Sequence, residues 1–163
     1  RVTVCGLGFY DIFINGTKIT KGLLAPYISN PDDIIYYDEY DLSEYLAEGE
    51  NVLGFQLGNG MQNSPGGQIW DFDIAAFRGA PRLAFALELD GETIEADDSV
   101  KTAASPIVFD DLRCGCFYDA RNESDGWAEP GFDDSARKSA LRADTAEGDF
   151  EARIRSPLHP CPL

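Results

Sequence analysis

Amide, carboxylate and indole side chains that suit carbohydrate binding lie close together in one Gly-rich part of the sequence. The residues are Asn59, Gln62, Asn63, Trp70 and Asp71. Amides and carboxylates hydrogen-bond to vicinal hydroxyls, while an indole face packs against the C–H face or a methyl group of a sugar ring. We therefore expect a sugar-binding site here. In the competing interpretation, Trp70 belongs to the core and the aspartates are only solvated.

Two aspartates of the same stretch are candidates for an oxygen-only cation site. Asp71 and Asp73 are two residues apart, so on a strand their side chains point to the same face. Two carboxylates on one face, together with loop carbonyls, suit Ca²⁺. The sequence requires no cofactor, and Ca²⁺ is the hard cation that we consider for these ligands.

A second group of ionic and aromatic residues lies between turn-forming residues later in the chain. It consists of Asp119, Arg121, Glu123 and Trp127. One interpretation makes this group a contact surface for a neighbouring domain or its substrate. The other, which we favour, is an internal Arg–carboxylate pair that fixes the last strand, with Trp127 closing the edge of the sheet.

The charge of the chain excludes several classes of partner. Its 163 residues include 13 Lys and Arg against 29 Asp and Glu, which gives a net charge of −16. This charge repels phosphate backbones and anionic lipid surfaces, so we expect no nucleic acid and no membrane as partner.

The cysteines do not form a recognisable metal motif. They stand at 5, 114, 116 and 161, and the Cys114–Cys116 spacing has one intervening residue where zinc motifs have two or more. The single His159 has no second histidine to act with it. We expect buried free thiols in a reducing compartment, and the absence of a signal peptide agrees with a soluble, cytoplasmic protein.

Short apolar runs separated by Gly, Asn and Asp predict an all-β fold. Asn15-Gly16 and Asp90-Gly91 have the composition of type I′ hairpin turns. One helical turn is expected from Asp41 to Leu46, with Asp41 as N-cap and Glu44 completing a capping box. The expected strands cover residues 1–5, 9–14, 18–19, 34–37, 51–57, 83–89, 92–95, 106–109 and 117–119.

Many strands joined by tight turns, without alternating helices, predict an antiparallel β-sandwich or jelly roll. We expect the sandwich over residues 1–135 and a wrapping segment or linker over 136–163. The stretch 58–67 is too polar and Gly-rich for a strand, so it is predicted as a long loop at one end of the sandwich, where binding sites tend to lie.

Four parts of the sequence carry a family resemblance, and they follow the family's order along nearly the whole chain. They are CGLGFYDIFING at 5–16, YYDEYDL at 36–42 with GENVLG at 49–54, DSVK at 98–101 with SPI at 105–107, and YDARNESDGW through PGFDDS over 118–135. Together they resemble the N-terminal β-sandwich domain of bacterial α-L-rhamnosidases, which are glycoside hydrolases. The sequence departs from the family pattern at Met61, Val100 and Arg137, where Trp is common, and at Cys116, which is often Glu.

The resemblance implies a non-catalytic piece of a larger enzyme. Family members hydrolyse terminal α-L-rhamnosyl linkages with inversion, using two glutamates on a helical (α/α) toroid that a β-rich chain of this length does not contain. Inversion needs two carboxyl groups roughly 6.5–9.5 Å apart across the sugar, and nothing in the sequence obviously places such a pair. Related sandwich modules of the family bind L-rhamnose, some of them through a Ca²⁺ ion held in a loop.

Two hypotheses for the function follow. The first is a carbohydrate-binding or substrate-guiding module, whose partners are L-rhamnose or a rhamnosylated glycan and the catalytic domain of the same chain. The second is a purely structural domain that packs on the toroid and stabilises it. The second hypothesis predicts an exposed apolar patch on the domain and no sugar binding.

Overall fold

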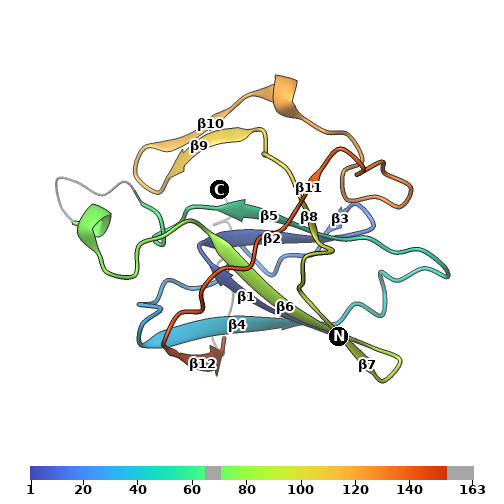
Figure 1. Cartoon of the computed structure of the whole chain (residues 1–163), viewed down its shortest axis with the longest axis horizontal. Helices are drawn as coiled ribbons and strands as arrows, with labels where there is room; N and C mark the ends of the chain where they lie inside the picture. Colours follow the sequence, from blue (N-terminus) through green and yellow to red (C-terminus); the bar gives the residue numbers. More distant parts are fainter. Residues whose placement is uncertain (65–70, 154–163) are drawn as a thin grey trace, which may run out of the picture.

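The structure, a computed structural model, describes residues 1–64 and 71–153, and within them it is almost entirely β (Figure 1). No helix of the described residues is long and apolar enough to cross a membrane. The elements are β1 (Val2–Leu7), β2 (Phe9–Ile14), β3 (Thr17–Lys18), β4 (Ile34–Tyr40), β5 (Leu53–Gly58), the 3₁₀ helix η1 (Phe72–Ile74), β6 (Arg82–Leu89), β7 (Glu92–Glu95), β8 (Lys101–Thr102), β9 (Ile107–Asp111), β10 (Gly115–Tyr118), η2 (Ala120–Asn122), β11 (Lys138–Ser139) and β12 (Asp149–Ala152).

Two sheets of these described strands enclose the core, as the predicted sandwich requires. One has the order β12-β4-β1-β6-β7 and the other the order β3-β2-β5. Val2 and Val4 of β1 and Ile12 of β2 are fully buried between them. The stacked rings of Phe55 on β5 and Phe85 on β6, 5.3 Å apart, join the two sheets. The alternation of buried and less buried residues along β1 and β2 is the period-2 pattern that places one face of each strand in the core.

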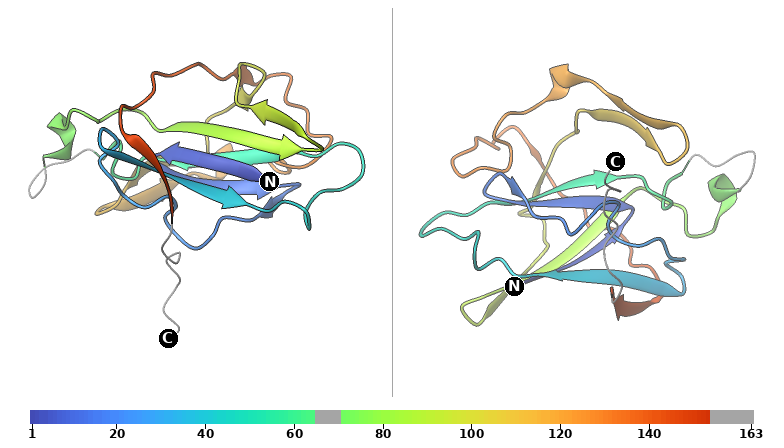
Figure 2. Two further views of the ribbon diagram at one scale, coloured as in Figure 1. Left: turned by 90° about the horizontal axis from the view of Figure 1, so that it is seen from below. Right: turned by 180° about the vertical axis from the view of Figure 1, so that it is seen from behind.

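Two smaller pairs of strands lie outside these sheets. β9 and β10 form a hairpin above β2 and β5, and β8 pairs with β11 (Figures 1 and 2). Both predicted hairpin turns are confirmed. Asn15 and Gly16 have φ values of 49° and 78°, and Asp90 and Gly91 have values of 50° and 84°, as a type I′ turn demands at both central positions.

The C-terminal part of the described chain contributes more to the fold than a linker would. Residues 138–139 pair with β8, and β12 adds a strand to the edge of the larger sheet. The β12–β4 pairing is parallel, whereas the other pairings of this sheet are antiparallel, so the predicted antiparallel sandwich has one parallel strand at this edge. Neither strand was predicted, because residues 139–149 are polar and Ala-rich and show no alternation.

The predicted helical turn at 41–46 is a single hydrogen-bonded turn with different capping. The amides of Tyr45 and Leu46 donate to the Leu42 carbonyl at 2.9 and 3.2 Å. Asp41 accepts from the Ser43 amide and hydroxyl and not from Glu44, so the predicted capping box is not formed. The turn ends because the Asn51 side chain bonds both backbone groups of Ala47, which a continuing helix would use.

The cysteines differ from the prediction. Cys114 and Cys116 are exposed, because Cys114 lies in the turn between β9 and β10 and Cys116 lies on β10, whose four residues are all exposed. Cys5 on β1 is half-buried, and burial raises the pKa of its thiol to about 11. Cys161 and His159 lie outside the described residues.

Candidate functional site

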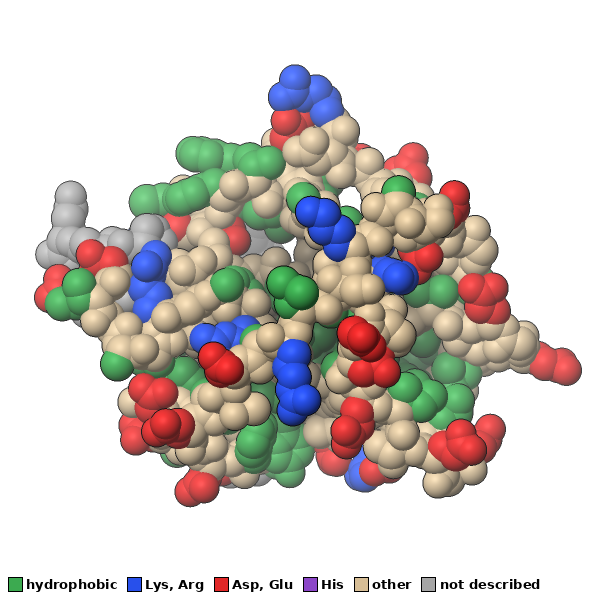
Figure 3. Space-filling view, in the orientation of Figure 1, with side chains coloured by type: hydrophobic (Ala, Val, Ile, Leu, Met, Phe, Trp, Pro, Cys, Tyr) green, Lys and Arg blue, Asp and Glu red, His purple; other side chains and the backbone are tan. Residues whose placement is uncertain are grey.

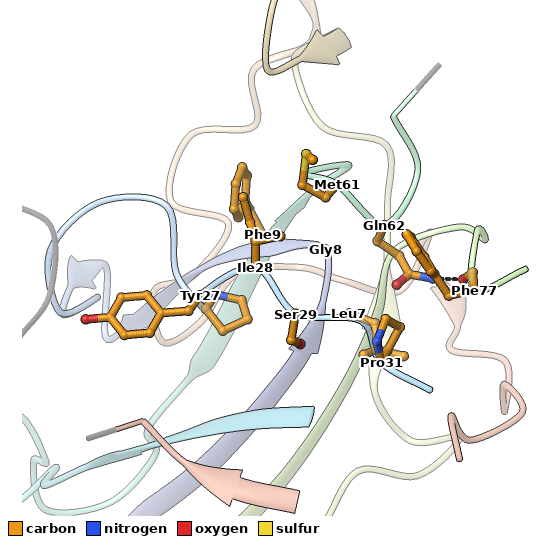
Figure 4. Close-up of a pocket in the computed structure, with 12 residues that line it drawn as sticks. Leu7, Gly8, Phe9, Tyr27, Ile28, Ser29, Pro31, Met61, Gln62 and Phe77 are labelled. Carbon is orange, nitrogen blue, oxygen red and sulfur yellow. Dashed lines mark hydrogen bonds between the residues drawn. The ribbon is translucent and has the colours of Figure 1, made fainter. Parts of the chain in front are cut away.

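A shallow hollow, open to solvent, lies at one end of the sandwich where several loops meet (Figure 4). Its walls come from the β1–β2 corner, the loop 26–31, the turn after β5 and the loop before β6. Phe9, Ile28 and Met61 lie on one side of it, Gln62 and Phe77 on the other, with Ser29 between them (Figure 4). The loop that follows β5 is therefore at one end of the sandwich, as predicted.

Glycines allow the chain to fold closely around this hollow. Gly8 turns the corner between β1 and β2 with a φ of 103°, and a Cβ there would lie 2.6 Å from the Gly58 carbonyl oxygen. Gly60 has a φ of 52°, and its Cβ would lie 3.2 Å from the backbone nitrogen of Phe9. Because side chains rarely adopt these φ values, the corner and the turn after β5 depend on glycine.

The amides predicted to bind sugar mostly hold their own loop. Asn59 is fixed to β9, since its backbone amide donates to the Asp110 carboxylate at 2.8 Å and its side chain to the Asp110 carbonyl at 3.2 Å. The Asn63 side chain donates to the Asn59 side-chain oxygen at 2.8 Å. Of the three amide residues, Gln62 alone is among those lining the hollow.

Gln62 is buried and oriented by one hydrogen bond. Its side-chain nitrogen donates to the Phe77 carbonyl at 2.7 Å, and its exposed fraction is 6%. This bond turns the amide oxygen of Gln62 towards Ser29 and the hollow (Figure 4). A fixed acceptor beside apolar walls is the arrangement that orients a small polar ligand.

The loop is also tied to the β9–β10 hairpin through a buried carboxylate. Asp111 accepts from the backbone amides of Arg113 and Cys114, both at 2.8 Å, and from the Ser64 hydroxyl at 3.3 Å. The amide bonds from Cys114 and Arg113 hold the pKa of the Asp111 carboxyl below its usual value.

The predicted cation pair does not have its predicted geometry. Asp71 precedes η1 and Asp73 lies within it, where the Ile74 amide donates to the Asp71 carbonyl at 3.2 Å. Because a 3₁₀ helix has three residues per turn, residues two apart do not share a face, as they would on a strand. Both aspartates are exposed, and over residues 1–64 and 71–153 no three His, Cys, Asp or Glu side chains group closely enough to hold a metal ion. Trp70 lies outside the described residues.

The second predicted group is a local, exposed arrangement. Asp119 caps η2 and pairs with Arg121 through two bonds of 2.8 and 2.6 Å, and these bonds lower the pKa of Asp119. The Arg121 side chain is 88% exposed, so the pair does not fix the last strand. Glu123 accepts from the Tyr118 hydroxyl at 2.5 Å. Trp127 packs edge-on against Phe13 of β2 at 5.2 Å. Because β2 is the middle strand of its sheet and Phe13 alternates with the core-facing Ile12 and Ile14, Trp127 covers the outer face of that sheet and not an edge.

A buried ionic cluster was missed by sequence reasoning. Arg153, directly after β12, pairs with Asp38 of β4, and their side chains are only 2% and 4% exposed. The other Asp38 oxygen accepts from the Tyr10 hydroxyl at 2.5 Å, and Tyr10 lies 3.0 Å from the Tyr40 hydroxyl. Burial raises the pKa of both tyrosines. The only local signal was the acidic pair Asp38 and Glu39 among the tyrosines of β4, since Arg153 is far away in the sequence.

The described residues that line the hollow are mostly apolar and include no carboxylate, imidazole, thiol or amine. Apolar walls with one fixed amide and one hydroxyl suit a small ligand that has a polar and an apolar side.

Sequence comparisons match this chain to α-L-rhamnosidases. The family model described as the α-L-rhamnosidase N-terminal domain matches residues 1–160. An α-L-rhamnosidase of Formosa agariphila is 39% identical over 143 residues, which are 83% of this chain and 15% of that protein. One from Streptomyces avermitilis is 31% identical over 97% of this chain and 16% of its own length. The chain thus spans about one sixth of these relatives.

Solved structures agree with the sequence comparison. The α-L-rhamnosidase from Dictyoglumus thermophilum superposes with a TM-score of 0.83 and 32% identity, over 96% of this chain and 17% of that one. The Streptomyces avermitilis enzyme, solved in complex with L-rhamnose, gives a TM-score of 0.77 and 29% identity over 90% and 15% of the two chains.

Proposed function

The chain belongs to the family of α-L-rhamnosidase N-terminal domains, and we propose that it is a non-catalytic, carbohydrate-binding module that guides rhamnosylated substrates within a longer α-L-rhamnosidase. Such an enzyme hydrolyses terminal α-L-rhamnosyl linkages, and the pair of carboxyl groups for an inverting reaction comes from another part of the polypeptide. Its partners are L-rhamnose or a rhamnosylated glycan and the catalytic domain of the same chain.

The hollow is the observation that carries this proposal. L-Rhamnose is a 6-deoxy sugar, so it presents a methyl group beside its ring hydroxyls. Phe9, Met61 and Phe77 offer apolar surface for the methyl group and the C–H face of the ring. The Gln62 amide oxygen and the Ser29 hydroxyl offer hydrogen-bond partners for the hydroxyls. A relative in the same family was solved with L-rhamnose bound.

The site differs in composition from the one that the sequence predicts. Gln62 keeps its predicted role as a ligand for the sugar, while Asn59 and Asn63 support it by holding the loop against β9. Binding through a Ca²⁺ ion near Asp71 and Asp73 remains a prediction, which needs a change of geometry or further ligands at η1.

A structural role is the second candidate, and an exposed apolar face favours it. On the β9–β10 hairpin the exposed fractions are 59% for Val108, 40% for Leu112, 64% for Phe117 and 55% for Tyr118. Apolar side chains gather over this hairpin in the space-filling view (Figure 3). A face of this kind fits packing against the rest of a larger protein.

Calorimetric titration of L-rhamnose into the purified domain, with Ca²⁺ and again with a chelator, distinguishes the two candidates. We expect saturable binding that Met61→Ala and Phe77→Ala each weaken about tenfold, because each removes apolar contact worth on the order of 1–2 kcal/mol. Phe117→Ala is the matched control, since it removes an exposed aromatic ring of the hairpin. Absence of binding in both conditions leaves the structural candidate.

A further inference from the structure

Arg153 is buried at the end of the edge strand β12 and reaches into the loop that forms part of the hollow. Its guanidinium carbon lies 5.2 Å from the centre of the Tyr27 ring, and its Nη2 donates to the Lys21 carbonyl at 3.4 Å. On its other side it pairs with Asp38. One side chain therefore joins β12, β4 and the loop that runs from Lys21 to Pro31.

Tyr27 works as an anchor for this loop. Pro26, Tyr27, Ile28 and Ser29 all line the hollow, and the ring of Tyr27 extends away from Gln62 (Figure 4). The guanidinium of Arg153 lies over that ring, within the range of a cation–π contact, and burial strengthens such a contact because water does not compete for the cation.

The other end of the loop is held by the same C-terminal segment. The Gly148 amide donates to the Pro31 carbonyl at 3.0 Å, and the Asp149 amide to the Asp33 carbonyl at 2.8 Å. All four residues of β12 are exposed, so burial of their side chains contributes little to docking of the strand. The fixed contacts are the backbone bonds and the buried Arg153.

We propose that Arg153 is a positioning residue for the hollow: paired with Asp38 and seated on Tyr27, it holds the loop 26–31 in the position that a rhamnosyl ligand meets. The expected effect on sugar binding rests on the proposed function, whereas the positioning of the loop can be tested separately.

The substitution Arg153→Lys separates positioning from simple stability. A lysine keeps a positive charge opposite Asp38, but it lacks the planar guanidinium that covers the Tyr27 ring and reaches the Lys21 carbonyl. The matched control is Arg137→Lys, because the Arg137 guanidinium lies 4.5 Å from the centre of the Phe132 ring, a contact of the same kind at a residue that does not line the hollow.

Two NMR measurements on the domain without sugar test whether Arg153 positions the loop. Amide hydrogen exchange at Gly148, Asp149 and Arg153 reports whether β12 stays docked, and the ring signals of Tyr27 with the amide signals of Ile28 and Ser29 report the loop. We expect Arg153→Lys to keep β12 protected while the signals of the loop shift and broaden, and Arg137→Lys to change neither. Unchanged loop signals, or loss of β12 protection together with the loop, overturn the proposal.

Titration of L-rhamnose into the same variants then tests the consequence. We expect Arg153→Lys to weaken binding about tenfold, which lies between the values for an exposed and for a desolvated cation–π contact, with wild-type affinity in the control. Equal affinity in Arg153→Lys and wild type overturns the inference. If the wild-type domain binds no L-rhamnose, the proposed function fails, and the NMR signals of the loop alone decide whether Arg153 positions it.

Discussion

Removal of one partner from the Asp38–Arg153 pair is expected to destabilise the domain far more than removal of both. The two side chains are 4% and 2% exposed, so either charge left alone is a buried, uncompensated ion. Breaking a buried pair in this way costs about 3–5 kcal/mol, whereas replacing both partners with neutral residues is often close to neutral. Asp38→Asn also weakens the acceptor of the Tyr10 hydroxyl bond.

The magnitude is large against the whole stability of a domain, which is about 5–15 kcal/mol. Asp38→Asn, Arg153→Met and the double variant form a cycle that urea unfolding can follow through tryptophan fluorescence. With a slope of roughly 2 kcal/mol per molar urea, a loss of about 4 kcal/mol moves the midpoint of either single variant down by about 2 M. The double variant is expected to lie within about 1 M of wild type.

The pattern of the three variants matters more than any single value. A coupling energy above about 2 kcal/mol between the two substitutions is expected for residues in direct contact. Additive effects, or single variants that each cost less than about 1 kcal/mol as exposed pairs do, would contradict a buried pair at this position.

Three further predictions concern the buried core residue Ile12, the thiol of Cys5 and the close packing of Gly148 against Pro31. Ile12→Ala, at a fully buried position between the sheets, should lower the free energy of unfolding by about 2–5 kcal/mol in the same urea assay. Cys5 is half-buried and its pKa is raised from 9.0 to about 11, so exposed Cys116 should react with iodoacetamide before Cys5 at neutral pH. The raised pKa of the Cys5 thiol stabilises the folded state below pH 9, and this stabilisation should be lost as the pH rises through about 11. In measurements of melting temperature against pH, Cys5→Ala should therefore reduce the decline at alkaline pH. Gly148→Ala places a Cβ 2.6 Å from the Pro31 carbonyl oxygen, so it should cost about 1–3 kcal/mol and raise hydrogen exchange in β12, and normal exchange there would refute the close approach.

Local sequence signals predicted most of the fold correctly. The turns at 15–16 and 90–91 are fixed by residues that tolerate positive φ, and β2, beside the first turn, alternates with period 2. β8, β11 and β12 gave no such signal because they have two to four residues each, and those residues are largely exposed. These short strands form by pairing with strands that are distant in the sequence, and a local sequence pattern does not reveal such pairing.

The candidate site was predicted less completely for a related reason. The loop after β5 was recognised by its Gly and amide content, and Gln62 does line a hollow. Other parts of the walls come from Phe9, Ile28 and Phe77, which look like ordinary strand or loop residues in the sequence. The sequence also did not predict where each amide side chain points. Asn59 bonds to Asp110 of β9, which is far away in the sequence, and the Asn63 side chain bonds to Asn59 within the same turn.

The measurement that tests the account most directly is a titration of L-rhamnose into ¹⁵N-labelled domain, followed by two-dimensional NMR, with L-mannose as the comparison sugar. L-Mannose carries a hydroxymethyl group where L-rhamnose has its methyl group, so it tests the apolar side of the hollow. The account predicts saturable shifts confined to residues 6–9, 26–31 and 61–64 and the region of Phe77, with weaker binding of L-mannose. Shifts that map to another part of the domain, or none with either sugar, would contradict it.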